Sequence, residues 1–339
     1  MLRGVSVLLV VIFHTRQALM PNGYIGVDIF FLISGFVLWP QINNLFFKRD
    51  KALSLSNRSP RGGVDYFQFL KRRYDRLIPT FVISLIINLS ILLVFSSYSI
   101  HKNMSLQVIS SVFFIGNLGA ETLVGNYFSP QPNPFMHLWS LSAEWQIYIF
   151  ATISIVLLKK LFPIKFTRAL FLISTLNLSI QILFELSIDS YYSSFSRIWE
   201  FYFGVLTAIY LRKFSLTINS VQLLVIQLIG ILSLIIIISP FEMRVIVSQV
   251  LGAIFFISFL ISSPSIYTRI NSVLLWLGDR SYSIYLYHFP LIYLSLHSPV
   301  SPSTFSVRVL GTAVSLISTL IIANWSYTKI EIPSIRNRK

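Results

Sequence analysis

Residues 3–14 read RGVSVLLVVIFH, and this stretch decides the fold class because it sets two ionisable side chains in an otherwise apolar run. Arg3 and His14 stand eleven residues apart, or three helical turns, so both side chains lie on one helix face about 16 Å apart. The run is long enough to cross a bilayer, where an ionisable group is costly unless it faces the protein interior or water. We therefore interpret His14 as a working imidazole deep in a membrane.

The rest of the chain has the composition of an integral membrane protein. Hydrophobic residues make up 55% of it and charged residues only 12%, against about 25% charged residues in soluble domains. Apolar runs recur from end to end, so the sequence predicts an all-α, polytopic helical bundle. We expect one membrane-embedded domain over residues 1–339, without a separate soluble domain. The chain has no cysteine, which excludes disulfides, thiolate metal sites and a cysteine nucleophile.

The distribution of Lys and Arg predicts the topology. The stretch 105–118 is apolar but short, and we expect it to be re-entrant or interfacial within an outer segment, 99–138. With this stretch left out, 22 of the 27 Lys and Arg fall on one side of the membrane. Counting it as a span leaves about 13 on one side and 14 on the other. Cytoplasmic loops are enriched in Lys and Arg, so we expect ten spans with both termini in the cytoplasm. The predicted spans are residues 2–20, 24–43, 77–98, 139–158, 169–187, 197–211, 216–238, 244–262, 280–297 and 304–326.

The net charge of +15 therefore collects on one membrane face. We expect the bilayer itself as its partner there, and no nucleic acid.

Acidic and imidazole groups gather in the outer half or the centre of five predicted spans, as His14, Asp28, Glu144, Glu200 and His288. Several of them also allow a purely structural interpretation. Asp28 can pair with an arginine such as Arg16, Glu200 can pair with Arg197 one helical turn away, and His288 can bond a carbonyl freed by a nearby proline. No acidic residue is adjacent to His14 in the sequence, and imidazole titrates near neutral pH, so chemistry is the favoured interpretation there.

Polar residues also mark the outer start of the fourth predicted span. His137, Ser140 and Glu144 share one helix face, and Gln146 and Tyr148 follow on a neighbouring face. Such a density of hydrogen-bonding groups suits hydroxyl-rich ligands such as sugars. The alternative is an interfacial helix start anchored by tryptophans.

Three arginines, Arg72, Arg73 and Arg76, precede the third predicted span at a depth close to that of Arg3. Such a cluster can stop membrane transfer, or it can bind phosphates through bidentate contacts.

Six segments that follow one another along the chain carry a resemblance to a known family. They are RGVSVLLVVIFH (3–14), GYIGVDIFFLISGF (23–36), RRYDRLIP (72–79), HLWSLSAEWQIY (137–148), SRIWEFYFG (196–204) and LGDRSYSIYLYHFP (277–290). Each alone is a weak signal, but the ordered set is specific. The chain resembles the integral-membrane acyltransferase-3 family, whose members O-acylate carbohydrates.

The resemblance implies that Arg3 and His14 are the family's arginine–histidine pair, with His14 as the catalytic imidazole. It also implies that Arg72, Arg73 and Arg76 help to hold acyl-CoA at the cytoplasmic face. Family members carry several residues before the Arg-Gly pair and optionally a C-terminal hydrolase-like domain, whereas this sequence begins MLRG and ends soon after the tenth predicted span. We therefore expect a stand-alone acyltransferase.

These observations together predict an O-acetyltransferase of the bacterial inner membrane. It would move an acetyl group from cytoplasmic acetyl-CoA to a hydroxyl of a surface polysaccharide or lipid-linked glycan. His14 would act as general base or as transient nucleophile, with Asp28 or Glu144 orienting it. The residues expected to bind the acceptor or support the site are His137, Ser140, Gln146, Tyr148, Glu200 and His288.

We expect no permanently bound cofactor, since acetyl-CoA is a substrate. We also expect no metal, because His14 and Asp28 offer too few ligands. The alternative functions are a transporter or flippase of a glycan precursor and a glycosyltransferase with a lipid-phosphate donor. Charged groups inside the membrane are equally natural in a transporter.

Overall fold

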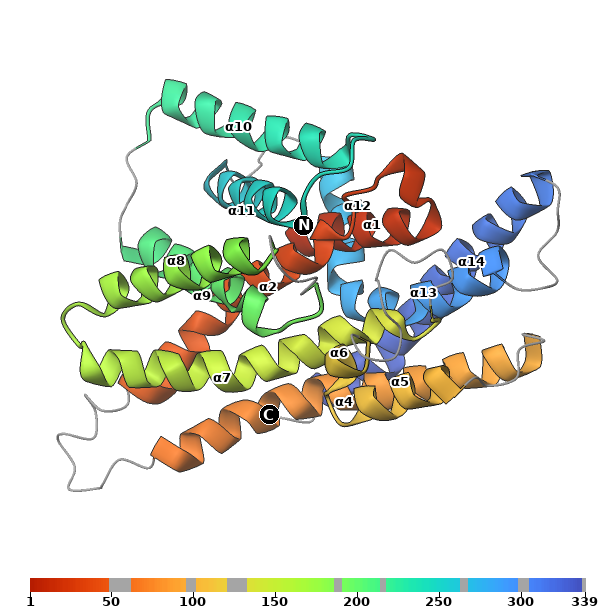
Figure 1. The fold of residues 1–339 in the computed structure, drawn as a ribbon, viewed down its shortest axis with the longest axis horizontal. Coiled ribbons are helices and arrows are strands. Elements are labelled where there is room, and N and C mark those ends of the chain that lie inside the picture. The colour runs from red at the N-terminus through yellow and green to blue at the C-terminus, as the bar shows by residue number, and fades with distance from the viewer. Residues whose placement is uncertain are drawn as a thin grey trace.

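The computed structural model describes residues 1–48, 62–95, 102–120, 133–185, 191–213, 218–262, 268–297 and 305–336. These residues form a helical bundle without strands (Figure 1), which confirms the all-α prediction. The helices are α1 (Leu2–Thr15), α2 (Ile25–Asn43), α4 (Gly62–Phe95), α5 (Lys102–Val112), α6 (Gly116–Gly119), α7 (Trp139–Leu161), α8 (Phe166–Glu185), α9 (Ile198–Lys213), α10 (Ser220–Ile238), α11 (Val245–Ser262), α12 (Thr268–Asp279), α13 (Ser281–His297), α14 (Phe305–Ser326) and α15 (Ile332–Arg336).

Five short helical turns extend or join these helices. They are η1 (Gln17–Leu19), η2 (Asn44–Lys48), η4 (Met136–Leu138), η5 (Phe195–Arg197) and η6 (Tyr327–Glu331).

Within the described residues, seven helices are long and apolar enough to cross a membrane. They cover Ile25–Phe47, Tyr66–Phe95, Met136–Leu161, Phe166–Leu183, Ser220–Ile238, Val245–Ser262 and Val307–Ile335. The other three predicted spans correspond to α1, α9 and α13, which have 14, 16 and 17 residues. A spanning helix needs about 20 residues, so length and composition support a multi-pass membrane protein but do not establish the count of ten.

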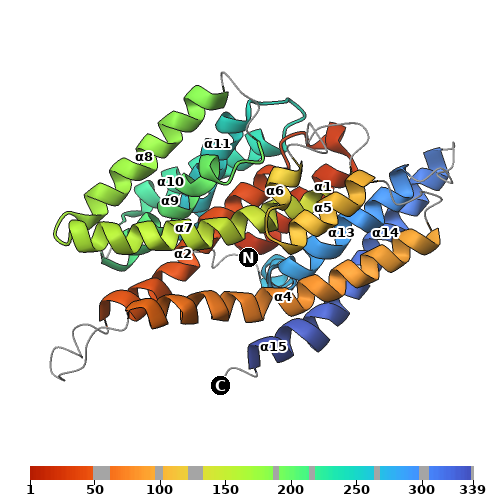
Figure 2. The ribbon, with the colours of Figure 1, turned by 60° about the horizontal axis from the view of Figure 1, so that its bottom comes forward.

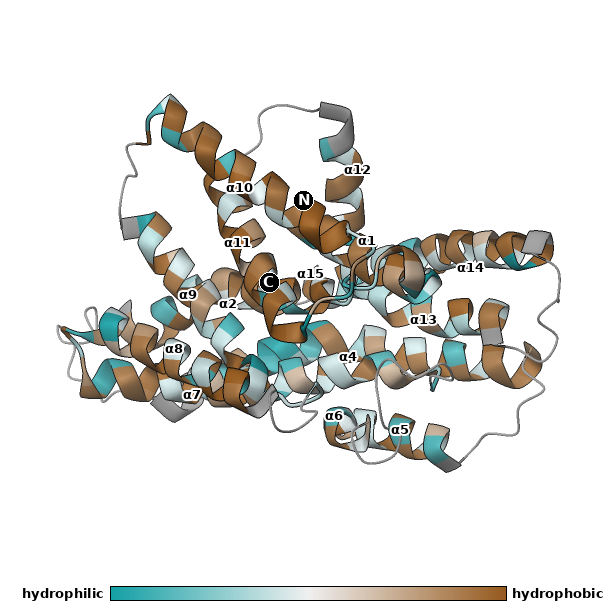
Figure 3. Cartoon of the chain, turned by 45° about the horizontal axis from the view of Figure 1, so that its top comes forward, coloured by the Kyte–Doolittle hydropathy of each residue, from teal (hydrophilic) through white to brown (hydrophobic). Residues whose placement is uncertain are grey.

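The outer surface of the bundle is apolar. Figure 3 shows hydrophobic colouring along most of α10 and α14. Exposed side chains on these helices include Val221, 70% exposed, and Ile321, 64% exposed. Exposure of so much contiguous apolar surface to water is unfavourable, whereas its exposure to lipid is not.

Two glycines let α2 and α9 pack with their backbones in contact. A Cβ atom on Gly35 would collide with the carbonyl oxygen of Phe201, and one on Gly204 would collide with that of Leu32. Small residues at such positions allow membrane helices to approach closely. This contact brings the first turn of α9 beside the first turn of α2, where Asp28 lies.

A proline in α13 creates a second link between distant helices. Pro290 has no N–H, so the carbonyl of Leu286 loses its partner within the helix. The Asn88 amide of α4 donates to this carbonyl at 2.9 Å. The freed carbonyl is thus satisfied by an amide from another helix, as a non-aqueous environment requires.

The stretch 105–118, expected to be re-entrant or interfacial, consists of two helices, because α5 ends at Val112 and Phe114 has a φ of 57° before α6 begins. The structure differs from the sequence predictions in two other segments. Helix α4 begins at Gly62, so Arg72, Arg73 and Arg76 lie inside a long helix and not ahead of one. Helix α12 was not predicted. Residues 121–132 of the expected outer segment lie outside the described residues.

The C-terminal segment continues from α14 as one helix over Val307–Ile335. η6 and α15 pack against α4, which Figure 2 shows from below. This packing brings an acidic residue, Glu331, beside the arginines of α4.

Candidate active site

Three imidazoles that are far apart in the sequence meet in the bundle. His14 comes from α1, His137 from η4 and His288 from α13. The ring centroids of His14 and His288 lie 5.1 Å apart, and those of His137 and His288 lie 5.6 Å apart. His137 and His288 are fully buried. The structure therefore gathers every predicted imidazole of the site into one cluster.

Hydrogen bonds connect two of these rings. Nε2 of His288 lies 3.0 Å from Nδ1 of His14, and Nδ1 of His288 lies 2.7 Å from the carbonyl oxygen of Tyr285. Neither ring nitrogen of His137 has a hydrogen-bond partner within the described residues. His14 is thus coupled directly to His288 and only indirectly to His137.

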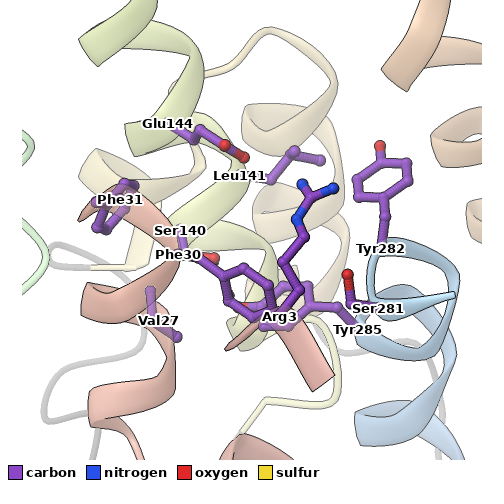
Figure 4. A pocket seen from close by; sticks show the side chains of 10 residues that line it. All are labelled: Arg3, Val27, Phe30, Phe31, Ser140, Leu141, Glu144, Ser281, Tyr282 and Tyr285. Atoms are coloured by element: carbon purple, nitrogen blue, oxygen red, sulfur yellow. Dashed lines mark hydrogen bonds between the residues drawn. The ribbon is translucent and has the colours of Figure 1, made fainter. Parts of the chain in front are cut away.

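A small cavity of about 50 Å³ lies beside the imidazole cluster. Figure 4 shows the Arg3 side chain reaching from α1 into the space between Glu144 of α7 and Tyr282 of α13. The residues that line the cavity are Arg3, Val27, Phe30, Phe31, Ser140, Leu141, Glu144, Ser281, Tyr282 and Tyr285.

Tyr285 joins the cavity to the imidazoles. Its hydroxyl donates to the carbonyl of His137 at 2.7 Å and lies 2.6 Å from Oγ of Ser140. The Tyr285 ring lies 5.4 Å from the ring of His288 and 5.7 Å from that of His137. The side chain of Tyr285 therefore both lines the cavity and contacts the rings of His288 and His137.

The polar face predicted at the start of α7 divides between two places. Ser140 and Glu144 both line the cavity, as their shared face predicts. The Glu144 carboxylate accepts from Ser34 at 2.8 Å and from Tyr148. Gln146 instead bonds Asn117 at 2.9 Å and Ser194 at 2.6 Å, which ties α7 to α6 and to the segment before η5. Gln146 does not line the cavity.

The three arginines of α4 do not act as one cluster. The side chain of Arg72 is exposed, and Arg73 turns inward and donates to Gln41 of α2 at 2.7 Å. Arg76 lies within electrostatic range of Arg3. The three positions spread over about 100° of the helix, and none of the three side chains is among those that line the cavity.

Glu331 is a site residue that the sequence analysis missed. Its carboxylate lies 3.9 Å from Nη2 of Arg76 and accepts from Ser283 of α13 at 3.1 Å. Its side chain is only 2% exposed. The available signal was a lone acid among the basic residues after the last predicted span, and periodicity gave no reason to bring it back into the bundle.

Three arginines each keep one buried donor without a partner in the part of the chain that the structure describes. The Nε atoms of Arg3, Arg73 and Arg76 are buried and have no hydrogen-bond partner within the described residues. Unsatisfied buried donors are costly, so these groups are suited to an anionic or carbonyl ligand.

Asp28 and Glu200 belong to a separate buried network. The Asp28 carboxylate forms an ion pair with Arg197 and accepts from Gln249 at 3.0 Å. Arg197 also donates to the carbonyl of Tyr191 and lies 4.0 Å from Glu200. Asp28, expected as a catalytic residue, instead has the arginine partner of the structural alternative, and that partner is Arg197 and not Arg16.

The two carboxylates expected to orient His14 have other neighbours. Asp28 is held by Arg197, and Glu144 faces Arg3 across the cavity. His288 lies within hydrogen-bonding distance of His14. Within the described residues, no group of three or more His, Asp or Glu is arranged to hold a metal ion.

Comparison with known proteins identifies the family. A family model described as an acyltransferase domain matches residues 1–324. The O-acetyltransferase OatA of Staphylococcus aureus (strain NCTC 8325 / PS 47) is 26% identical over 352 residues, which cover 98% of this chain and 56% of that protein. A putative O-acetyltransferase of Staphylococcus aureus (strain COL) is 30% identical over 359 residues with the same coverage. This chain thus spans little more than half the length of these curated relatives.

No solved structure matches the chain. The family match extends over nearly the whole bundle, including the helices that carry the cavity and the three imidazoles. The chain therefore belongs to the acyltransferase-3 family and is an integral-membrane acyltransferase domain.

Proposed function

We propose that this chain, acting as one membrane-embedded domain, transfers an acetyl group from cytoplasmic acetyl-CoA to a hydroxyl of a cell-surface polysaccharide or a lipid-linked glycan. Family membership and the O-acetyltransferase names of the relatives support the reaction class. The observation that carries the proposal is the cavity, which has Arg3 on its wall and Tyr285, the neighbour of the imidazoles, on another.

The donor binds through Arg3 and Arg76. These guanidiniums lie in electrostatic range of one another, and each keeps a buried Nε without a partner in the described part of the chain. Arginine pairs suit the phosphates of CoA because they offer several charge-assisted hydrogen bonds. Arg72 makes a smaller contribution because it is exposed, whereas Arg73 donates to Gln41 through Nη2 and keeps a buried Nε like the other two.

The acyl arm then lies in the cavity with its thioester toward Ser140 and Tyr285. His14 removes the proton of the acceptor hydroxyl, and the oxygen attacks the thioester carbon. A C–O bond forms and the C–S bond breaks. The sulfur leaves as a thiolate and takes up the proton held by His14, so the product is CoA thiol and the enzyme returns to its starting charge.

The proposed orientation places both termini in the cytoplasm of the bacterial inner membrane. In Figure 1 the end of α7 and the start of α8 lie at one end of the bundle, together with the end of α9 and the start of α10. Lys159 and Lys160 lie in the last turn of α7, and Lys165 lies in the connection from α7 to α8. Basic residues at that end support a cytoplasmic location for it.

His14→Ala tests the function. The variant removes the base without an adverse effect on helix propensity, so we expect a normal amount of protein in the membrane and loss of acetylation of the surface glycan. Proton NMR of the purified polysaccharide measures its O-acetyl content. The matched control is Ile12→Ala on the same helix, because Ile12 is 37% exposed and lies outside the cavity. Acetylation close to normal in His14→Ala would refute the assignment.

A further inference from the structure

The small cavity beside the imidazoles has an apolar wall and a polar wall. The apolar wall, called the α2 wall below, consists of Val27, Phe30 and Phe31 of α2, and the polar wall consists of Ser281, Tyr282 and Tyr285 of α13. Figure 4 shows Phe31 on the opposite side of the Arg3 side chain from Tyr282. A ligand that enters along the polar wall therefore meets apolar side chains on the far side.

The polar wall is connected to the proposed donor site. The Tyr282 hydroxyl donates to the carbonyl of Leu77 at 2.9 Å, and Leu77 directly follows Arg76 on α4. The next residue of α13, Ser283, donates to Glu331, which pairs with Arg76. A donor held by Arg76 thus reaches the cavity from the side of α13 and directs its acyl group toward α2.

Close backbone contacts hold the α2 wall in place. A Cβ atom on Gly26 would collide with the carbonyl oxygen of Ser6 in α1, and the contact of Gly35 with α9 is equally close. Val27 and Phe31 lie between these two glycines and are buried. Because α2 is packed against a neighbouring helix on both sides of these residues, the wall does not move outward to admit a larger group without strain.

The volume of the cavity matches a short acyl group. A water molecule needs a cavity of about 10–15 Å³. The volume of about 50 Å³ therefore accommodates about four non-hydrogen atoms, which is the size of an acetyl group with its sulfur. A butyryl group is longer by two methylenes, and these have no room in front of the α2 wall.

We propose that the α2 wall restricts the donor to acetyl-CoA, with Val27 and Phe31 as residues that determine this specificity. The inference rests on the proposed function, in which the thioester lies toward Ser140 and Tyr285. The CoA part is the same in every acyl-CoA, so the arginines do not distinguish one acyl chain from another. A single extra methylene in an apolar pocket typically changes kcat/KM by about 10–200-fold.

A competition between two donors tests this specificity. Permeabilised membranes that contain the full chain and the glycan of the cell receive carbon-13-labelled acetyl-CoA and butyryl-CoA at equal concentrations. NMR of the purified glycan counts the newly formed esters. While both donors remain in excess, the ratio of butyryl to acetyl esters equals the ratio of the two kcat/KM values and does not depend on the amount of folded protein. We expect a ratio of about one to ten or lower in the native protein.

Two variants open the α2 wall. Val27→Ala removes two carbon atoms, the number by which butyryl exceeds acetyl, and Phe31→Ala removes a whole ring. We expect the ratio of butyryl to acetyl esters to rise at least about tenfold in each. Val27→Ala is the milder change and keeps the test valid if Phe31→Ala does not fold. The matched control is Ile29→Ala, because Ile29 is a buried residue of α2 that does not line the cavity, and its ratio should equal that of the native protein.

The two hypotheses fail in different ways. No labelled ester of either kind in membranes with the native chain overturns the proposed function. Labelled esters with a butyryl-to-acetyl ratio near one in the native protein, or an unchanged ratio in the active Val27→Ala variant, overturn the role of the α2 wall alone. An equal rise in Ile29→Ala also overturns it, because the effect would then arise from loosened packing and not from the cavity.

Discussion

Replacement of the Arg76–Glu331 pair by two neutral amides tests whether Arg76 holds the donor. The two side chains lie 3.9 Å apart, with 25% and 2% of their surfaces exposed. Arg76→Gln alone leaves a buried carboxylate without its cation, which typically destabilises a protein by about 3–5 kcal/mol. The double variant Arg76→Gln/Glu331→Gln removes both charges at once, so the bundle should keep its fold.

The expected effect on donor binding follows from the loss of the proposed hydrogen bond between Arg76 and the donor. A hydrogen bond to a charged group contributes about 1.5–3 kcal/mol. Its removal should weaken acetyl-CoA binding by about tenfold to about 150-fold. Turnover at saturating donor should change less, because contacts to the non-reacting part of a substrate act as uniform binding.

Calorimetric titration of the purified full chain with a non-hydrolysable acetyl-CoA analogue measures this affinity. The single variant Glu331→Gln should bind the analogue at least as tightly as the native protein, since it removes only the competing acid. Arg72→Gln is the matched control, because Arg72 lies one turn earlier on α4 and its side chain is exposed. Unaltered affinity in the folded double variant would show that Arg76 does not bind the donor.

The remaining predictions concern the buried network and the topology. Asp28→Asn removes the carboxylate that pairs with Arg197, whose side chain is 1% exposed, so thermal unfolding should show a free energy of unfolding lower by about 3–5 kcal/mol. The paired variant Asp28→Asn/Arg197→Met should recover part of this loss. Equal stability of Asp28→Asn and the native protein would contradict the network. Cysteines at Ile164 and Phe241, which are 95% and 76% exposed, should react with a membrane-impermeant thiol reagent from opposite sides, Phe241→Cys in intact spheroplasts and Ile164→Cys only after the membrane is opened. Labelling of both from outside would overturn the proposed orientation.

Hydropathy and helical periodicity determined much of this protein without a structure. Long apolar runs with few charges require helices in lipid, because each backbone polar group must be paired within its own segment. The same periodicity placed Ser140 and Glu144 on one face of α7, and both line the cavity. The family motifs likewise followed from the sequence, since their order along the chain is independent of how the helices pack.

The tertiary structure alone decided which residues meet. His14 and His288 are 274 positions apart and share a hydrogen bond, while Asp28 pairs with Arg197 and Arg76 pairs with Glu331. Periodicity specifies the face of a helix on which a side chain lies, but not the helix that packs against that face. That choice depended on local shape: Gly35 and Gly204 let α2 approach α9, and the packing of η6 against α4 brought Glu331 beside Arg76. Helix faces are therefore a local property of this sequence, whereas the partners of its buried charges depend on close packing between distant segments.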